Sequence, residues 1–320
     1  QLAFTLAHGD LAGSWPIHVR ESDGTLVSID RRPNYWLDPR AEPGAKPAGD
    51  LNATGPLVPD VAHQPSLACL PYLVTGDRYY ADEMAFWANY VLLATYQDTQ
   101  YNARGGSAGL LHSHEVRGIG WGLRNLVDAA AWLPDDHPQQ EYFAEKVRNN
   151  LAWLDEHSQG VEPLGILWYD KRAENWDPGS THWVIALWEH NYLAWAIGWA
   201  NAQGFAGGAL HQYQIVRLQH ALFAEEATRD GAAPYLLPVG VRQQSGDNAV
   251  AAVQWYEQIS QCYAGPCQFA GYYGTDARLM LLEAERLGLP RAREHREWLE
   301  SQPGMAEYLR ERAGWFILPQ

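Results

Sequence analysis

The stretch VRGIGWGLRNLVDAA, at residues 116–130, has apolar side chains that recur three or four positions apart. Val116, Ile119, Leu123 and Leu126 would therefore lie on one side of an α-helix, in the spacing typical of a buried face. Polar side chains recur at the same spacing on a second side. We expect a helix that packs into a core with one face and lines a water-filled hollow with the other.

The same helical spacing recurs along the chain from Pro65 onward. Gly, Pro and Asp residues interrupt it at 75–77, 134–138 and 287–290, where one helix would end and the next begin. We expect helices at 65–75, 77–97, 115–133, 138–158, 182–203, 206–229, 248–263, 269–287 and 290–301. Short connections between most of them predict antiparallel hairpins, with longer loops in alternation. The pattern predicts an all-α protein, an incomplete (α/α) toroid of about four to five helical hairpins.

Residues 1–60 have a different character, with Pro, Gly and Asp at short intervals. The Asp23-Gly24 step precedes a β-like patch at 25–29 and is typical of a hairpin turn. We therefore expect two parts: a short β-containing N-terminal arm at 1–60, packed on a helical toroid domain at 61–320.

Composition excludes several classes of protein. The chain has 320 residues, with 23 Lys and Arg against 38 Asp and Glu, so its net charge is −15 at neutral pH. Such a surface repels phosphates, which argues against a nucleic-acid partner. The longest apolar runs, at 183–188 and 194–199, are far shorter than the roughly 20 residues that cross a bilayer, so we expect no membrane span.

The aromatic residues are mainly Trp and Tyr, with 15 Trp and 17 Tyr against 7 Phe. Their rings combine an apolar face with a polar group, as sugar rings do, so their excess favours a glycan partner. Some of them belong to a core, and we interpret the helical stripe Trp188, Tyr192, Trp195 and Trp199 in that way. Tyr272, which lies among glycines, would either stack on a sugar or pack closely between helices.

Two segments resemble a known family. The residues AHQPSL at 62–67 and PYLVTGDRYY at 71–80 look like an early helical hairpin of the (α/α) toroid domains of polysaccharide lyases and related glycoside hydrolases. The likeness is to the toroid of exo-rhamnogalacturonan-lyase-like proteins, and it extends over about residues 60–287. It implies a toroid fold and a polysaccharide or oligosaccharide substrate.

The polar face of the central helix begins just before its first turn. The residues that share this face are His114, Arg117, Trp121, Arg124 and Asp128. A buried helix that keeps such side chains on one side would line a site, in which Trp121 and Arg124 bind substrate beside Arg117. The alternative is a solvated face on which Arg124 and Asp128, four positions apart, form an ion pair.

These residue types suit β-elimination on a sugar acid. A cation must neutralise the sugar carboxylate so that the C5 proton becomes acidic, and Arg117 offers a bidentate guanidinium. His114 or His63 would take that proton, and a tyrosine, Tyr101 or Tyr72, would protonate the leaving oxygen. The sequence therefore favours a lyase that cleaves a uronic-acid-containing glycan.

A second cluster carries the competing hypothesis of glycoside hydrolysis. Trp176, His182 and Trp183 lie where a loop enters the next helix, and we expect them to bind substrate. On that helix Glu189 lies among aromatic residues, where burial favours the protonated carboxyl of a general acid. Hydrolysis needs two carboxyl groups. The other candidates are Glu115 and Asp177.

The cysteines give little sign of a metal site. Cys69 lies in an apolar run and is interpreted as a buried free thiol. Cys262 and Cys267 flank a turn and would form either a small disulfide loop or two separate thiols. A pair with this spacing and no His partner is not typical of zinc, so we expect neither a metal nor another cofactor.

Three hypotheses of function follow. The first is a polysaccharide lyase, the second a glycoside hydrolase, and the third a non-catalytic glycan-binding module of a larger secreted protein. Because Gln1 opens the chain without a recognisable leader, we expect the mature form of a secreted or periplasmic protein, or a piece of a longer one.

Overall fold

The computed structural model describes the greater part of the predicted helices. The residues that it describes are 28–31, 61, 65–95, 105–111, 116–158, 182–223, 237–242, 250–252 and 271–311. The chain divides into two compact units, and each is described by itself. The first unit comprises Gln1–Ser113, Arg117–Trp153 and Gln203–Ala206, and the second comprises His114–Val116, Leu154–Ala202 and Gly207–Gln320.

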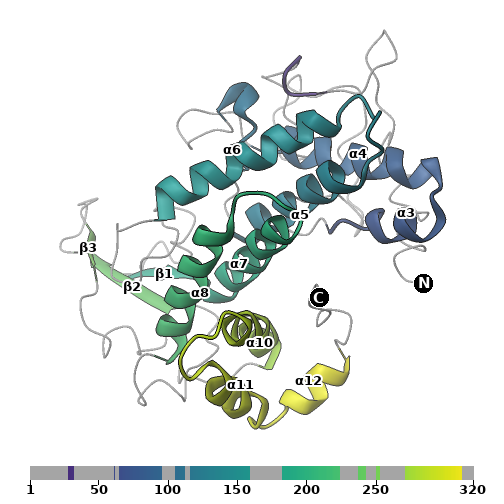
Figure 1. Cartoon of the computed structure of the whole chain (residues 1–320). Coiled ribbons are helices and arrows are strands. Elements are labelled where there is room, and N and C mark those ends of the chain that lie inside the picture. The colour runs from purple at the N-terminus through teal and green to yellow at the C-terminus, as the bar shows by residue number, and fades with distance from the viewer. Residues whose placement is uncertain are drawn as a thin grey trace, which may run out of the picture. The chain divides into compact units, whose positions relative to one another are not determined.

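Helices dominate the described part of the first unit (Figure 1). They are α3 (Cys69–Thr75), α4 (Arg78–Leu93), the short 3-10 helix η3 (Gly106–Ala108), α5 (Val116–Trp132) and α6 (Gln140–Ser158). α5 and α6 belong to this unit except for Val116 and the residues after Trp153.

The turn between α3 and α4 lies where the sequence predicts that one helix ends and the next begins. Gly76 has a left-handed φ of 67°, and its N–H donates to the carbonyl of Tyr72 at 2.7 Å, which ends α3. The side chain of Asp77 then accepts the N–H of Tyr79 at 2.9 Å and caps the start of α4. These local hydrogen bonds explain why the boundary could be placed from the sequence.

The core of the first unit forms around α4, which is buried along most of its length. Met84 and Leu92 are among its fully buried side chains. On α5, Ile119, Leu123 and Leu126 are each no more than 1% exposed. The apolar face predicted for this helix is therefore confirmed.

Lys146 of α6 ties two distant segments to this core. Its side chain is 1% exposed, and its Nζ donates to Oδ1 of Asp30 at 2.8 Å and to the carbonyl of Ser107 at 2.7 Å. One turn further along α6, Nδ2 of Asn150 donates to the carbonyl of Gly109 at 2.9 Å. These contacts fix the segments around Asp30 and Ser107 against α6.

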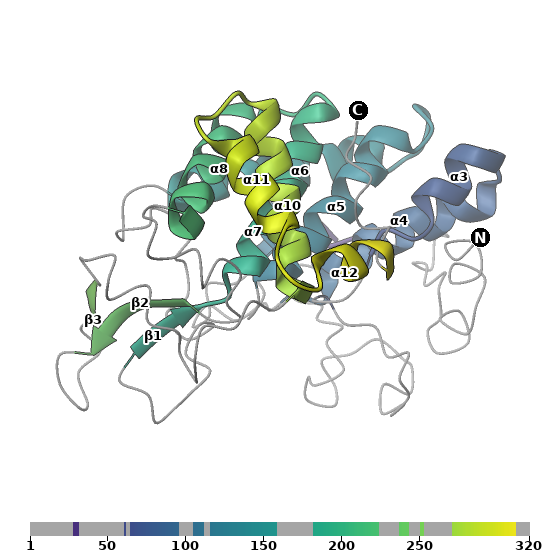
Figure 2. The same ribbon diagram turned by 90° about the horizontal axis from the view of Figure 1, so that it is seen from below.

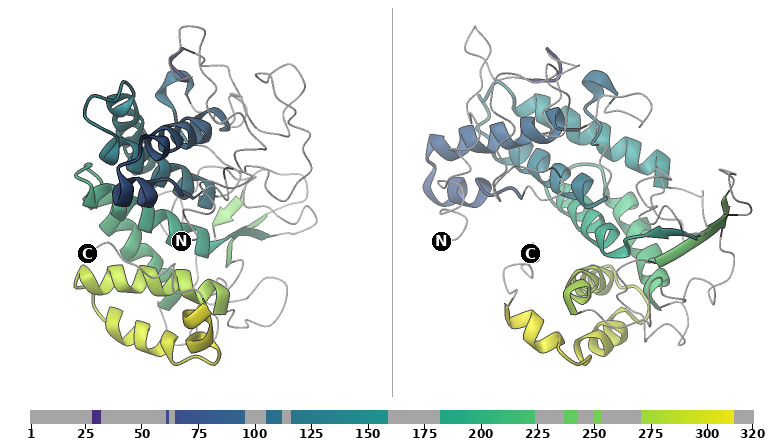
Figure 3. Two further views of the ribbon diagram at one scale, coloured as in Figure 1. Left: turned by 90° about the vertical axis from the view of Figure 1, so that its right-hand side faces the viewer. Right: turned by 180° about the vertical axis from the view of Figure 1, so that it is seen from behind.

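The second unit combines helices with a small sheet (Figure 2). Its described helices are α7 (Leu187–Ala202), α8 (Gly208–Phe223), α10 (Gly271–Arg286), α11 (Ala292–Glu300) and α12 (Met305–Glu311). α10 packs against the four others and forms with α11 the yellow-green hairpin of Figure 3. α7 is buried along most of its length, and its buried positions include polar as well as apolar side chains. Of the stripe predicted to lie in the core, Tyr192 is buried, whereas Trp188, Trp195 and Trp199 are half-buried.

Three short strands form an antiparallel sheet in the order β1-β2-β3. They are β1 (His182–Ile185), β2 (Leu237–Arg242) and β3 (Val250–Ala252). β1 runs directly into the start of α7 (Figure 2). The sheet thus fixes where α7 begins.

The described part of the chain is mainly helical, as predicted, but it is not entirely so. The helix predicted at 182–203 is wrong at its start, where β1 forms, and the helix predicted at 248–263 is wrong where β3 lies. Trp183, Val184 and Ile185 are aromatic or β-branched and favour a strand. The toroid arrangement and the N-terminal arm stay predictions, and most of the arm lies outside the described residues.

Candidate functional site

The polar face predicted from the sequence lies on α5. Arg117, Trp121 and Arg124 are half-buried, while most other residues of this helix are buried. They are four and three positions apart, so they form one stripe along the helix, which we call the α5 stripe. The three side chains therefore share one partly exposed face, as expected from their spacing, and their role in binding stays a prediction.

Arg124 is also tied to the core beneath the α5 stripe. Its Nη2 lies 3.9 Å from Oδ2 of Asp128, whose side chain is 2% exposed. Cys69, a buried free thiol as predicted, forms a hydrogen bond with the same carboxylate. Burial and the neighbouring carboxylate raise the pKa of Cys69, so the thiol stays protonated and donates. The ion pair that the sequence offered as an alternative therefore exists, and it anchors Arg124.

The other predicted site residues are described only in part. Those outside the described residues are His63, Tyr101, His114 and Trp176. Those described by their backbone alone are His182 and Trp183 in β1 and Tyr272 in α10. Glu189 lies in the first turn of α7, in the second unit, and is 3% exposed, so its predicted burial is confirmed. Cys262 and Cys267 also lie outside the described residues.

A buried carboxyl in α4 was missed by the sequence analysis. Glu83 is 1% exposed and accepts hydrogen bonds from the side chains of Tyr79 and Trp87, four positions before and after it. Burial raises the pKa of Glu83 to about 7, although these two hydrogen bonds oppose the rise. Burial and the Glu83 carboxyl in turn raise the pKa of Tyr79 to about 12. The available signal was the spacing of Tyr, Glu and Trp at every fourth position of an apolar helix.

Two buried histidines of the second unit are neutral at pH 7. Burial lowers the pKa of His190 on α7 to about 3, and burial together with Arg286 lowers that of His211 on α8 to about 4. Nε2 of His211 lies 3.7 Å from Oε2 of Glu283, which pairs with Arg286 at 2.8 Å. A Cβ at Gly198 would lie 2.7 Å from Nε2 of His211, so glycine allows this ring to pack against α7. Both histidines are therefore interpreted as packing residues.

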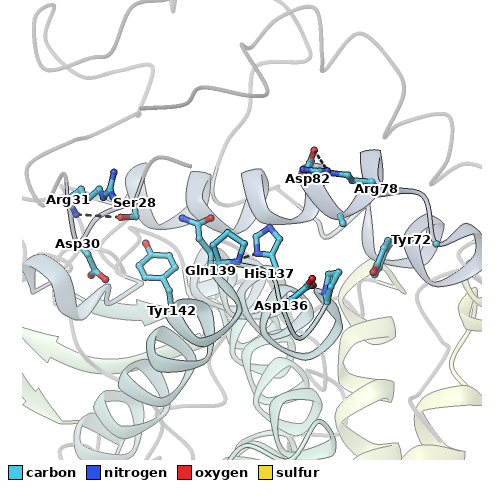
Figure 4. A pocket seen from close by; sticks show the side chains of 14 residues that line it. Ser28, Asp30, Arg31, Tyr72, Arg78, Asp82, Asp136, His137, Gln139 and Tyr142 are labelled. Carbon is cyan, nitrogen blue, oxygen red and sulfur yellow. Dashed lines mark hydrogen bonds and ion pairs between the residues drawn. The ribbon is translucent and has the colours of Figure 1, made fainter. Parts of the chain in front are cut away.

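The first unit also contains a polar hollow (Figure 4). Its volume is about 750 Å³. This lies within the roughly 300–1,000 Å³ typical of small-molecule sites. It is lined by residues 28–31, by the turn between α3 and α4 with the adjoining helix ends, by the turn at 134–139 and by the start of α6. The charged and aromatic side chains of its described wall include Asp30, Arg31, Tyr72, Arg78, Asp82 and Asp136.

Hydrogen bonds fix part of this wall. The N–H of Gln139 donates to Nδ1 of His137 at 3.2 Å, and Oε1 of Gln139 accepts the side-chain amide of Asn89 at 2.8 Å. The hydroxyl of Tyr142 accepts the N–H of Ile29 at 3.3 Å. The sequence analysis singled out none of these five residues, and two of the three contacts join parts of the chain that are 50 and 113 positions apart.

The described residues show neither a metal site nor a membrane-spanning helix. Among the described residues, no three His, Cys, Asp or Glu side chains are arranged to hold a metal ion. Of the described helices, none is long and apolar enough to cross a membrane. No family model matches the chain, and no curated protein or solved structure matches it either.

Proposed function

We propose that this chain degrades an acidic polysaccharide and that the α5 stripe binds its uronic acid units. The observation that supports the proposal is the α5 stripe itself, in which two arginines and a tryptophan occupy the partly exposed side of a largely buried helix. A partly exposed pair of guanidinium groups beside an indole suits an anionic ligand that also has an apolar face.

Arg117 is the group that would bind the sugar carboxylate. Its planar guanidinium can donate two parallel hydrogen bonds to the two carboxylate oxygens. Trp121 follows four positions later, about 6 Å along the helix axis, so its ring can lie against the same sugar unit. Arg124 follows three positions later and is held in place by Asp128, whose carboxylate offsets its charge.

β-Elimination follows from these roles. When the carboxylate is neutralised, the proton on C5 becomes acidic enough for a histidine to remove. His114, three positions before Arg117, or His63 would take that proton, and its bonding electrons would form the C4–C5 double bond. The bond from C4 to the leaving oxygen then breaks, and Tyr101 would supply the proton to that oxygen. The products are an unsaturated uronate and a new chain end.

A panel of acidic and neutral polysaccharides tests this proposal. Incubation with a uronic-acid polymer should raise the near-ultraviolet absorbance as the unsaturated uronate forms, in step with new reducing ends. Reducing ends without absorbance would assign a glycoside hydrolase, and binding without either signal would assign a glycan-binding module. Each of these two results would overturn the lyase. Because such substrates lie outside cells, we also propose a secreted or periplasmic protein.

A pair of matched variants tests the α5 stripe. Arg117→Gln should abolish the rise in absorbance because it removes the proposed carboxylate ligand. Arg148→Gln is the control, since Arg148 is an exposed arginine of α6 that pairs with the exposed Glu141. It should keep the wild-type rate, and circular dichroism should show that both variants fold. Wild-type turnover in Arg117→Gln would reject the assignment.

A further inference from the structure

The polar hollow of the first unit contains no residue of the α5 stripe, yet it has the features of a binding site. Tyr72, the alternative to Tyr101 as proton donor in the sequence analysis, lies in its wall. Its walls come from segments as far apart in the chain as residues 28–31 and 134–139. Lys146 fixes the first of these segments through Asp30, and Asn89 fixes the second through Gln139. A cavity whose walls are held in this way can receive a ligand without first being ordered.

The described wall carries charges of both signs, with three carboxylates against two arginines. Asp30 pairs with Nζ of Lys146 at 2.8 Å, and the same Nζ also pairs with Oε1 of Glu145 at 3.1 Å. Asp82 is matched by Nε of Arg78 at 3.9 Å. The further charged side chains of the described wall are Arg31 and Asp136, which are opposite in sign. An anionic ligand would therefore meet the three carboxylates, which outnumber the arginines of the described wall.

The uncharged side chains of the wall offer both polar and apolar contacts. Tyr72 lies toward one end of the hollow and Tyr142 toward the other, with His137 and Gln139 between them (Figure 4). Imidazole, amide and phenol groups can donate and accept hydrogen bonds. The tyrosine rings also give flat apolar surface. Such a wall suits a ligand that carries many hydroxyl groups and C–H faces.

We propose that this hollow binds a neutral saccharide. Sugar hydroxyls donate and accept at once, so they can pair with the carboxylates, the guanidinium groups and the amide of the wall. A uronic acid would instead bring its own carboxylate toward Asp82 and Asp136. None of the residues of the α5 stripe lines the hollow, so saccharide binding here and elimination at α5 are separate events.

Calorimetric titration of the full chain with neutral tetrasaccharides of glucose, galactose, mannose and xylose tests the proposal. At least one of them should bind, and trigalacturonate should not compete with it. Asp136→Asn should weaken this binding about tenfold or more, because a hydrogen bond to a charged group is lost. Tyr72→Ala should weaken it as well, through loss of the ring surface. Both side chains are at least partly exposed, so the variants should fold.

Two controls make the outcome specific. Asp135→Asn removes the neighbouring exposed carboxylate, which does not line the hollow, and should leave the affinity unchanged. Arg117→Gln should also leave it unchanged, and loss of binding in that variant would move the saccharide to α5 and overturn the proposal. Failure of every neutral tetrasaccharide to bind more tightly than about 10 mM would overturn it too. Competition by trigalacturonate would contradict the charge argument.

Discussion

Replacing Glu83 by glutamine should remove a pH dependence that this carboxyl imposes on folding. Its pKa is about 7 in the folded chain, against the ordinary value of 4.5. Between these values the folded protein holds a proton that the unfolded chain has released. The stability linked to this group is therefore fully present below about pH 4.5 and is lost as the pH rises through 7.

The magnitude follows from the same two pKa values. Their difference corresponds to about 3 kcal/mol in the free energy of unfolding. Since the side chain is 1% exposed, solvent screens this effect little. Glutamine has nearly the same shape, carries no charge and can still accept from Tyr79 and Trp87. We expect Glu83→Gln to match the wild type at about pH 4 and to exceed it by about 3 kcal/mol at about pH 8.

Urea unfolding followed by tryptophan fluorescence measures this difference at both pH values. Comparing two proteins at each pH cancels the titration of His190 and His211, which both proteins share. Glu141→Gln is the matched control, because Glu141 is 82% exposed on α6 and should show no such change with pH. A difference between wild type and Glu83→Gln that stays the same at both pH values would refute the assignment of Glu83 as a buried, protonated carboxyl.

Three further substitutions test the packing of the two units. Gly198→Ala would place a methyl group 2.7 Å from Nε2 of His211. It should cost about 1–3 kcal/mol in urea unfolding, and His211→Ala added to it should recover most of that loss, whereas simple additivity would contradict the clash. Lys146→Met removes the 2.8 Å contact with Asp30. It should cost about 2–3 kcal/mol in thermal unfolding, and a change below about 0.5 kcal/mol would show that Lys146 does not fix that segment. Trp195→Ala removes a half-buried indole 5.4 Å from the ring of Tyr192 and should cost about 1–3 kcal/mol, less than the loss of a fully buried tryptophan. A Trp195→Ala variant of wild-type stability that loses glycan turnover would instead assign Trp195 to a substrate site.

Helix boundaries could be predicted where neighbouring residues set them. Gly76 and Gly288 adopt φ values of 67° and 70°, the left-handed conformation that ends a helix, and the sequence marked both positions. The sheet could not be placed in the same way. Its strands are short, and β1 is stabilised by pairing with β2. The helices α7 and α8 lie between these two strands in the chain. From local spacing alone, the helix is therefore predicted to begin at His182, where the strand forms instead.

The same contrast applies to the sites. The α5 stripe could be predicted because Arg117, Trp121 and Arg124 are related by the helical repeat alone. The hollow could not, since its wall depends on contacts such as that between Lys146 and Asp30, which are 116 positions apart. Such pairs leave no periodic pattern in the sequence.

The decisive measurement is the structure of this protein with a bound acidic oligosaccharide, such as tetragalacturonate. We expect a sugar carboxylate within about 3 Å of the Arg117 guanidinium, in the geometry of a hydrogen bond, and a sugar ring against Trp121. An oligosaccharide bound elsewhere, with protein side chains covering Arg117 and Trp121, would show that the polar face of α5 serves packing and does not bind a glycan.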